Sequence, residues 1–119
     1  MVTVVISIYK STISHTEDIS LRQCAKVLGK HTITIIKPAH LNSIPFLHYF
    51  KDVRVENFPQ HYFEGIEGYN RLMLSVEFYE RFLKYEFILI HQLDAFVFSD
   101  QLLYWCHQKY DYIGAPWLF

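Results

Sequence analysis

Residues 86–98 decide the fold of this chain, and they read Glu-Phe-Ile-Leu-Ile-His-Gln-Leu-Asp-Ala-Phe-Val-Phe. The apolar run from Phe87 to Ile90 predicts a strand that is buried on both faces, as central strands of parallel sheets are. One acid, Asp94, follows this run. Open α/β sheets bind their ligands at the carboxyl ends of the strands, so we expect Asp94 to lie where small-molecule chemistry takes place.

Working outward from this strand, β-type and helix-type patterns alternate along the chain. The expected strands are Val2–Ile8, Thr32–Ile36, Val53–Phe58 and Phe87–Ile90, with a last extended segment at Asp111–Ile113. The expected helices run from the Ser14/Glu17 capping box to Gly29, from Ser43 and Pro45 to Phe50, over Tyr69–Leu83 with a second cap at Ser75, and from Asp100 through Cys106. This alternation predicts an α/β fold, a mostly parallel Rossmann-like sheet with flanking helices.

Length and composition narrow the class of protein. The 119 residues suit a single domain spanning residues 1–119, and 51% hydrophobic and 18% aromatic residues suit a densely packed core. A formal charge of -1 and the absence of a Lys/Arg run exclude a phosphate-tracking nucleic-acid surface.

Cys24 and Cys106 lie far apart between helix-forming apolar residues, which favours reduced core thiols over a disulfide framework or a zinc motif. The apolar start, Met1 to Tyr9, lacks a basic leader region and resembles a first strand. No segment has the roughly 18 apolar residues of a membrane span. We therefore expect a cytoplasmic protein with no transmembrane segment.

Asp94 has two interpretations, a ligand for a metal or sugar, or a turn and N-cap residue that accepts backbone hydrogen bonds. Gln92 favours the functional one. On an extended backbone, residues two apart point to the same side, so Gln92 and Asp94 would face one pocket.

The segment Glu64 to Arg71 gathers two glycines, two acids, an aromatic ring, an amide and a guanidinium just before a helix. Arg71 has the geometry to clamp a phosphate, Asn70 to bond a base or ribose edge, and Tyr69 to stack. The structural alternative is a turn and helix start in which Arg71 pairs with Glu67. When this segment is considered by itself, the structural alternative is favoured.

Several other kinds of site are not supported by the sequence. The seven histidines show no His-x-x-x-His spacing, and the side chain of His91 should face away from Gln92 and Asp94, which favours a packing role. Glycine-rich dinucleotide and P-loop motifs, and a Gly-x-Ser-x-Gly elbow, are absent from the sequence.

Five motifs together resemble a family of uncharacterised glycosyltransferase-like domains, which is similar to nucleotide-sugar glycosyltransferases of the GT-A fold. They are Val-Val-Ile-Ser-Ile-Tyr-Lys at 4–10, Ser-Leu-Arg-Gln-Cys at 20–24, Ile-Glu-Gly-Tyr-Asn-Arg-Leu-Met at 66–73, Gln-Leu-Asp-Ala-Phe-Val-Phe at 92–98 and Tyr-Asp-Tyr-Ile-Gly-Ala-Pro-Trp at 110–117. The resemblance covers essentially the whole chain. It implies a domain that binds a nucleotide-sugar donor and transfers the sugar to an acceptor hydroxyl.

The resemblance also implies residue roles. Asp94 would be the catalytic and metal-binding acid of an Asp-x-Asp-like signature. The nucleotide-sugar contacts would be Ile8, Tyr9, Tyr69, Asn70, Arg71, Gln92 and Asp94, and the donor or acceptor side would hold Asp111 and Trp117.

The metal is the first point at which the sequence departs from the family pattern. An Asp-x-Asp signature binds manganese or magnesium, but here Phe96 stands where the second acid would be. In a shifted register, Gln92-Leu93-Asp94, an amide stands in place of one acid. A metal-free alternative gives the neutralisation of the leaving group to Arg71.

The second departure is length, because family members continue beyond the Gly-Ala-Pro-Trp motif. We therefore expect a domain that is incomplete at its C-terminal end, with a partner chain or oligomer covering the apolar C-terminal surface. The rival interpretation is a degenerate, non-catalytic nucleotide-binding or interaction module of the same fold. A nucleotidyltransferase is a weaker third alternative.

Overall fold

Four parallel strands form one sheet in the described part of the chain, residues 1–42 and 44–114 of a computed structural model. The strands are β1 (Val2–Ser7), β2 (Thr32–Pro38), β3 (Val53–Phe58) and β4 (Phe87–His91), in the spatial order β3-β2-β1-β4. β1 therefore lies inside the sheet, paired with β2 on one side and with β4 on the other. The predicted Rossmann-like α/β fold is confirmed.

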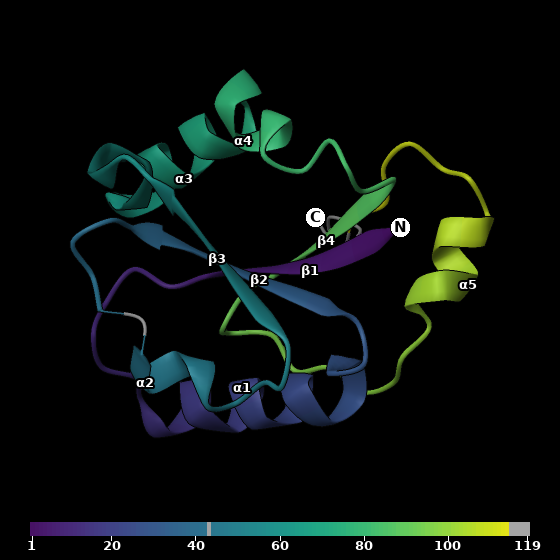
Figure 1. Ribbon diagram of the computed structural model, residues 1–119, viewed down its shortest axis with the longest axis horizontal. Helices are drawn as coiled ribbons and strands as arrows, with labels where there is room; N and C mark the ends of the chain where they lie inside the picture. Colours follow the sequence, from purple (N-terminus) through teal and green to yellow (C-terminus); the bar gives the residue numbers. More distant parts are fainter. Residues whose placement is uncertain (43, 115–119) are drawn as a thin grey trace, which may run out of the picture.

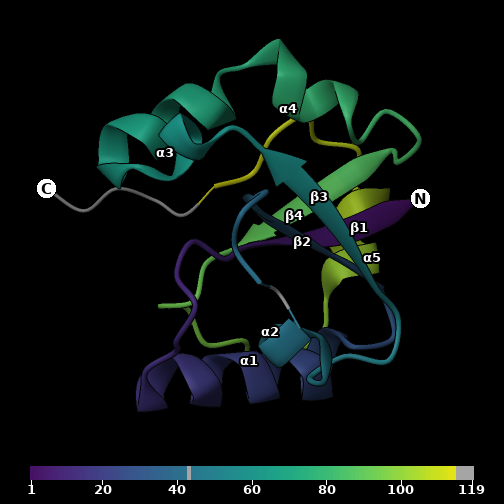
Figure 2. The same cartoon turned by 60° about the vertical axis from the view of Figure 1, so that its left-hand side comes forward.

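Helices cover both faces of the sheet and make three layers (Figure 1). One face carries α1 (His15–Leu28) and α2 (Ile44–Leu47), and the other carries α3 (Gly65–Met73) and α4 (Val76–Glu80). A 3-10 turn, η1 (Gln60–Phe63), leads into α3, and α5 (Leu102–His107) lies beside the amino ends of β1 and β4. Figure 2 shows the same layers from a second direction.

Alternation along the strands explains the two cores. Val4 and Ile6 of β1 pack with Leu21 and Cys24 of α1, whereas Val5 packs toward Phe78 of α4 on the other face. A β-branched strand with both faces apolar can only be placed in the middle of such a sandwich. The core thus fixes the position of β1.

Local start signals are confirmed where the sequence carries them. Ser14 accepts a hydrogen bond from the Glu17 amide and Glu17 bonds back to the Ser14 amide, which completes the capping box. Ser75 accepts from the Phe78 amide and separates α3 from α4. Asp100 accepts from the Leu102 amide at the start of α5.

Two expectations about the elements are wrong. β4 lies at the edge of the described sheet and is half-buried, because only β1 pairs with it. α3 begins at Gly65 rather than at Tyr69, since Gly65 has a positive φ of 69° that turns the chain into the helix. The expected extended segment Asp111–Ile113 belongs to no helix or strand and is exposed. The predicted start of the second helix at Ser43 lies outside the described residues.

Candidate functional site

The carboxyl ends of β1 and β4 form the topological switch point of the sheet. From β1 the chain steps outward to β2 and β3, and it then crosses back to place β4 on the other side of β1. Connections leave the sheet in opposite directions at such a point, which opens a crevice where α/β proteins bind ligands. Tyr9 follows β1 at this edge, and Gln92 and Asp94 follow β4.

Asp94 lies in a tight turn at this edge. The Ala95 amide donates to the Gln92 carbonyl at 3.0 Å, and Leu93, beside Asp94 in the turn, is buried. The turn overturns the expectation of an extended backbone, so strand alternation does not set the directions of Gln92 and Asp94. Asp94 is exposed, and within residues 1–42 and 44–114 its carboxylate accepts no hydrogen bond and caps no helix.

A cavity of about 420 Å³ lies between this turn and the first turns of α1. Its lining residues come from two segments of the chain: Ser14, Thr16, Glu17, Ile19 and Ser20 from α1 and its cap, and Leu93, Asp94, Ala95 and Phe96 from the turn after β4. We call it the Asp94 cavity. It combines hydroxyl and carboxylate groups with an apolar wall, which is the chemistry that small polar ligands require.

The N-terminus of α1 offers little to an anion. Its capping box satisfies the amides of Ser14 and Glu17, and the carboxylates of Glu17 and Asp18 stand in the first turn. The hydrogen bond from the Ser14 amide, together with Lys10 at 3.2 Å, outweighs the effect of burial and lowers the pKa of Glu17. In many α/β proteins a helix N-terminus at this edge of the sheet binds a phosphate. Here the protein's own carboxylates already place negative charge at that position, which opposes the binding of an anion.

Side chains of α1 hold the segment that follows the Asp94 turn. The Ser20 hydroxyl donates to the Ala95 carbonyl at 2.6 Å, and the Gln23 amide donates to the Val97 carbonyl at 2.7 Å. We call residues 95–100 the strap, because they run along α1. Sequence reasoning did not identify Ser20 or Gln23, although their i, i+3 spacing along one side of the helix was a usable signal.

His91, the last residue of β4, lies next to Ser20 of α1. Its side chain is buried and its Nε2 atom lies 3.5 Å from the Ser20 hydroxyl. Burial lowers the pKa of His91, and the charge of Asp94 opposes that shift only in part. The predicted packing role of His91 agrees with this position.

The other sequence-predicted residues are not gathered at the Asp94 cavity. Ile8 is 1% exposed, so its side chain belongs to the core and only its backbone is available to a ligand. Tyr9 is exposed at the end of β1. Tyr69, Asn70 and Arg71 lie on α3, across the sheet from α1, and none of them lines the cavity.

Arg71 is exposed, and the expected ion pair with Glu67 is not formed in the described part of the chain. Asp111 is exposed after α5, and Trp117 lies outside the described residues. The structure therefore brings together the turn after β4 and the start of α1, rather than the set that the resemblance implied.

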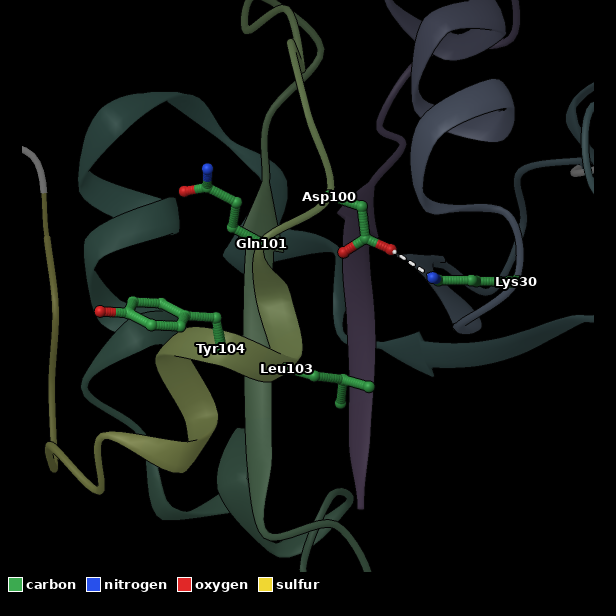
Figure 3. A pocket seen from close by; sticks show the side chains of 5 residues that line it. All are labelled: Lys30, Asp100, Gln101, Leu103 and Tyr104. Carbon is green, nitrogen blue, oxygen red and sulfur yellow. Dashed lines mark ion pairs between the residues drawn. The ribbon is translucent and has the colours of Figure 1, made fainter.

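A second cavity, of about 470 Å³, lies at the amino edge of the sheet (Figure 3). It is lined by Lys30, Asp100, Gln101, Leu103 and Tyr104. Its carboxylate is engaged, since Asp100 accepts from Lys30 at 3.3 Å and from the Leu102 amide at 3.1 Å. Gln101 and Tyr104 point away from the Lys30–Asp100 pair in the close view, so the polar groups do not converge on one ligand position.

The implied divalent metal does not fit the residues present. Among residues 1–42 and 44–114, no three His, Cys, Asp or Glu side chains gather into a metal-binding group. Asp94 alone offers one exposed carboxylate, whereas a resident magnesium or manganese takes several oxygen ligands.

None of the helices described is long and apolar enough to cross a membrane. No curated protein and no solved structure matches the chain. A family model described as "Protein of unknown function (DUF5672)" matches residues 52–119, more than half of the sequence, and the matched part includes β3, β4 and the Asp94 turn. The chain belongs to the DUF5672 family.

Proposed function

We propose that this chain is the donor-binding part of a glycosyltransferase-like domain. It binds a nucleotide-sugar at the carboxyl edge between β1 and β4 and presents the sugar for transfer to an acceptor hydroxyl. One observation carries the proposal: the carboxylate of Asp94, which has no hydrogen bond or ion pair among the described residues, stands in a turn at the switch point, beside a cavity of about 420 Å³. The five motifs that resemble glycosyltransferase-like domains support the same reaction class.

The proposal gives each residue at this edge a role. Asp94 accepts hydrogen bonds from sugar hydroxyls, Gln92 contacts the donor at the rim, and Tyr9 stacks on the nucleotide. The backbone of Ile8 borders the nucleotide. Asp111, which is exposed, and Trp117 are proposed for the donor or acceptor side from the resemblance alone.

Asn70 and Arg71 remain proposed nucleotide contacts on the strength of the resemblance. Arg71 is exposed and unpaired within the described residues, so its charge is available to a diphosphate. Arg71, rather than a metal, is proposed to neutralise the leaving diphosphate, because the described side chains do not gather into a metal-binding group.

Transfer breaks the bond between the anomeric carbon and the diphosphate oxygen and forms a bond from that carbon to the acceptor oxygen. The acceptor hydroxyl gives up its proton to solvent, and the nucleoside diphosphate leaves with the bonding electron pair. The protein's contribution in the described part is to hold the sugar against Asp94, since positioning alone accounts for a large share of such rate enhancements.

Calorimetric titration with UDP-glucose and with GDP-mannose tests the proposal, each in manganese and in EDTA. We expect one donor to bind in both buffers. Asp94→Asn should weaken that binding about tenfold or more, because a hydrogen bond to a charged group is worth about 1.5–3 kcal/mol. Asp52→Asn, at another exposed acid, is the matched control and should leave binding unchanged. No binding of either donor, or equal losses in both variants, contradicts the proposal.

A second function, a non-catalytic interaction module, has its own supporting observation. Large apolar side chains after β4 are exposed, among them Phe98, Tyr104, Trp105 and Tyr112. An oligomer or partner chain covering this surface would explain it. Light scattering of the purified chain that shows an oligomer, together with no donor binding, would favour this function. A cytoplasmic location is part of either proposal and is supported by two unpaired cysteines, Cys24 and Cys106.

A further inference from the structure

The charges around the Asp94 cavity are one-sided. Asp94 and Glu17 contribute carboxylates to its wall, and Ser14, Thr16 and Ser20 contribute hydroxyls. Among the described residues no Lys or Arg lines it. A bound group therefore meets the carboxylate of Asp94, which has no ion-pair partner in the described part of the chain.

The cations nearest to this wall are already paired. Lys10 lies 3.2 Å from Glu17, and Arg22 forms an ion pair with Asp18 at 2.9 Å. The capping box satisfies the Glu17 amide, and the carboxylates of Glu17 and Asp18 stand in the first turn of α1, so the helix end already carries negative charge that opposes an anion. The two nearby cations are thus neutralised by acids of the protein itself.

The rest of the lining is apolar. Phe96 and Ile19 are exposed and Leu93 is buried. A sugar ring presents hydroxyl groups at its edge and a face of C–H groups, so it matches a lining that combines carboxylates and hydroxyls with an aromatic ring.

We infer that the Asp94 cavity takes the sugar of the donor, in neutral or amine-bearing form, and rejects sugars that carry a carboxylate. This inference rests on the proposed function and adds to it the substrate class. The diphosphate lies outside the cavity, because its charge would face the carboxylate of Asp94, which no described cation neutralises. Discrimination comes from repulsion as well as from attraction, as in other charge-selective sites.

The test compares donors that share a nucleotide and differ only in the charge of the sugar. UDP-glucose, UDP-glucosamine and UDP-glucuronate form one set, and GDP-mannose and GDP-mannuronate form the other. We expect the neutral donor to bind at least tenfold more tightly than the uronate, and UDP-glucosamine to bind at least as tightly as UDP-glucose. The discrimination should shrink between 0.05 and about 0.5 M salt, since exposed charges are screened.

Two variants test whether the preference for a neutral sugar comes from the carboxylates that line the Asp94 cavity. Asp94→Asn and Glu17→Gln should each reduce the preference for the neutral sugar severalfold, and Gln at position 17 retains the capping-box hydrogen bond. Asp52→Asn should leave the preference unchanged. If the uronate binds as tightly as the neutral donor, the charge selectivity is overturned while the proposed function stands. If no donor of either set binds, both are overturned.

Discussion

The Nε2 atom of His31 lies 2.9 Å from the Oδ2 atom of Asp100, and this contact joins the turn after α1 to the start of α5. Lys30 and the Leu102 amide bond to the same carboxylate. Burial alone would raise the pKa of Asp100, but the Leu102 amide, His31 and Lys30 outweigh it and leave the pKa below its ordinary value. The C-terminal end of the strap is therefore tied to α1 by one acid.

We expect Asp100→Asn to lower the free energy of unfolding by about 1–2 kcal/mol at pH 7, because the carboxylate loses its charged hydrogen bonds. The folded pKa of Asp100 is depressed, so its stabilisation is present above the unfolded value of about 3.9 and is lost as the pH falls through the folded pKa. Urea unfolding at pH 7 and pH 3 measures this difference. Asp52→Asn is the control, and an equal loss at both pH values would contradict a charge effect.

Ser20→Ala should destabilise the chain by about 1–2 kcal/mol, since it leaves the Ala95 carbonyl without its donor. The loss should be local to the strap. Hydrogen exchange of residues 95–98 should accelerate more than exchange of β2, measured by mass spectrometry. Ser11→Ala, at an exposed position, should change neither the stability nor the exchange rates. Uniform acceleration of exchange across the sheet would contradict a role of Ser20 that is confined to the strap.

Gly68→Ala should cost more than Gly65→Ala although both residues lie in α3. A Cβ at Gly68 would stand 2.4 Å from the His61 carbonyl oxygen of η1, and backbone cannot move aside cheaply. Gly65 has open space around it and only its positive φ opposes a side chain, at about 1–2 kcal/mol. We expect at least about 2 kcal/mol for Gly68→Ala by urea unfolding. The reverse order would show that α3 does not pack on η1 in this way.

The two thiols should differ in reactivity. Burial raises the pKa of Cys24 to about 11, so about one molecule in a thousand carries the thiolate there at pH 8. Cys106 is half-buried, and burial with the charge of Glu86 raises its pKa as well. With a thiol reagent at pH 8, Cys106 should react first and Cys24 only on unfolding. Cys106→Ser should remove the faster phase, and a fast phase that survives in this variant would contradict the buried position of Cys24.

Local features of the fold could be predicted from the sequence. The capping box of Ser14 and Glu17, the cap at Ser75 and the β-branched run of β1 each depend on residues close together in the chain. These signals act within one helical turn or one strand, so no knowledge of the tertiary structure is needed to interpret them.

Features that depend on distant pairing could not be predicted in this way. Phe87 to Ile90 has the composition of a central strand. It lies at the edge of the described sheet because it pairs with β1 and with no other strand there, and the sequence does not show this. The turn at Asp94 could not be predicted either, because the residues around it are mostly apolar and include no glycine or proline that would signal a turn. The contacts of Ser20 with Ala95 and of Gln23 with Val97 join segments far apart in the chain, and the candidate site was therefore only partly anticipated.

The inner position of β1 has a consequence for the newly made chain. β1 leaves the ribosome before the other three strands, but its second neighbour, β4, does not exist until residues 87–91 have been synthesised. Throughout that interval one edge of a mostly apolar strand has no partner, and such edges invite aggregation. Production of this chain should thus be most sensitive to chaperone supply and temperature during elongation, before β4 can close the sheet.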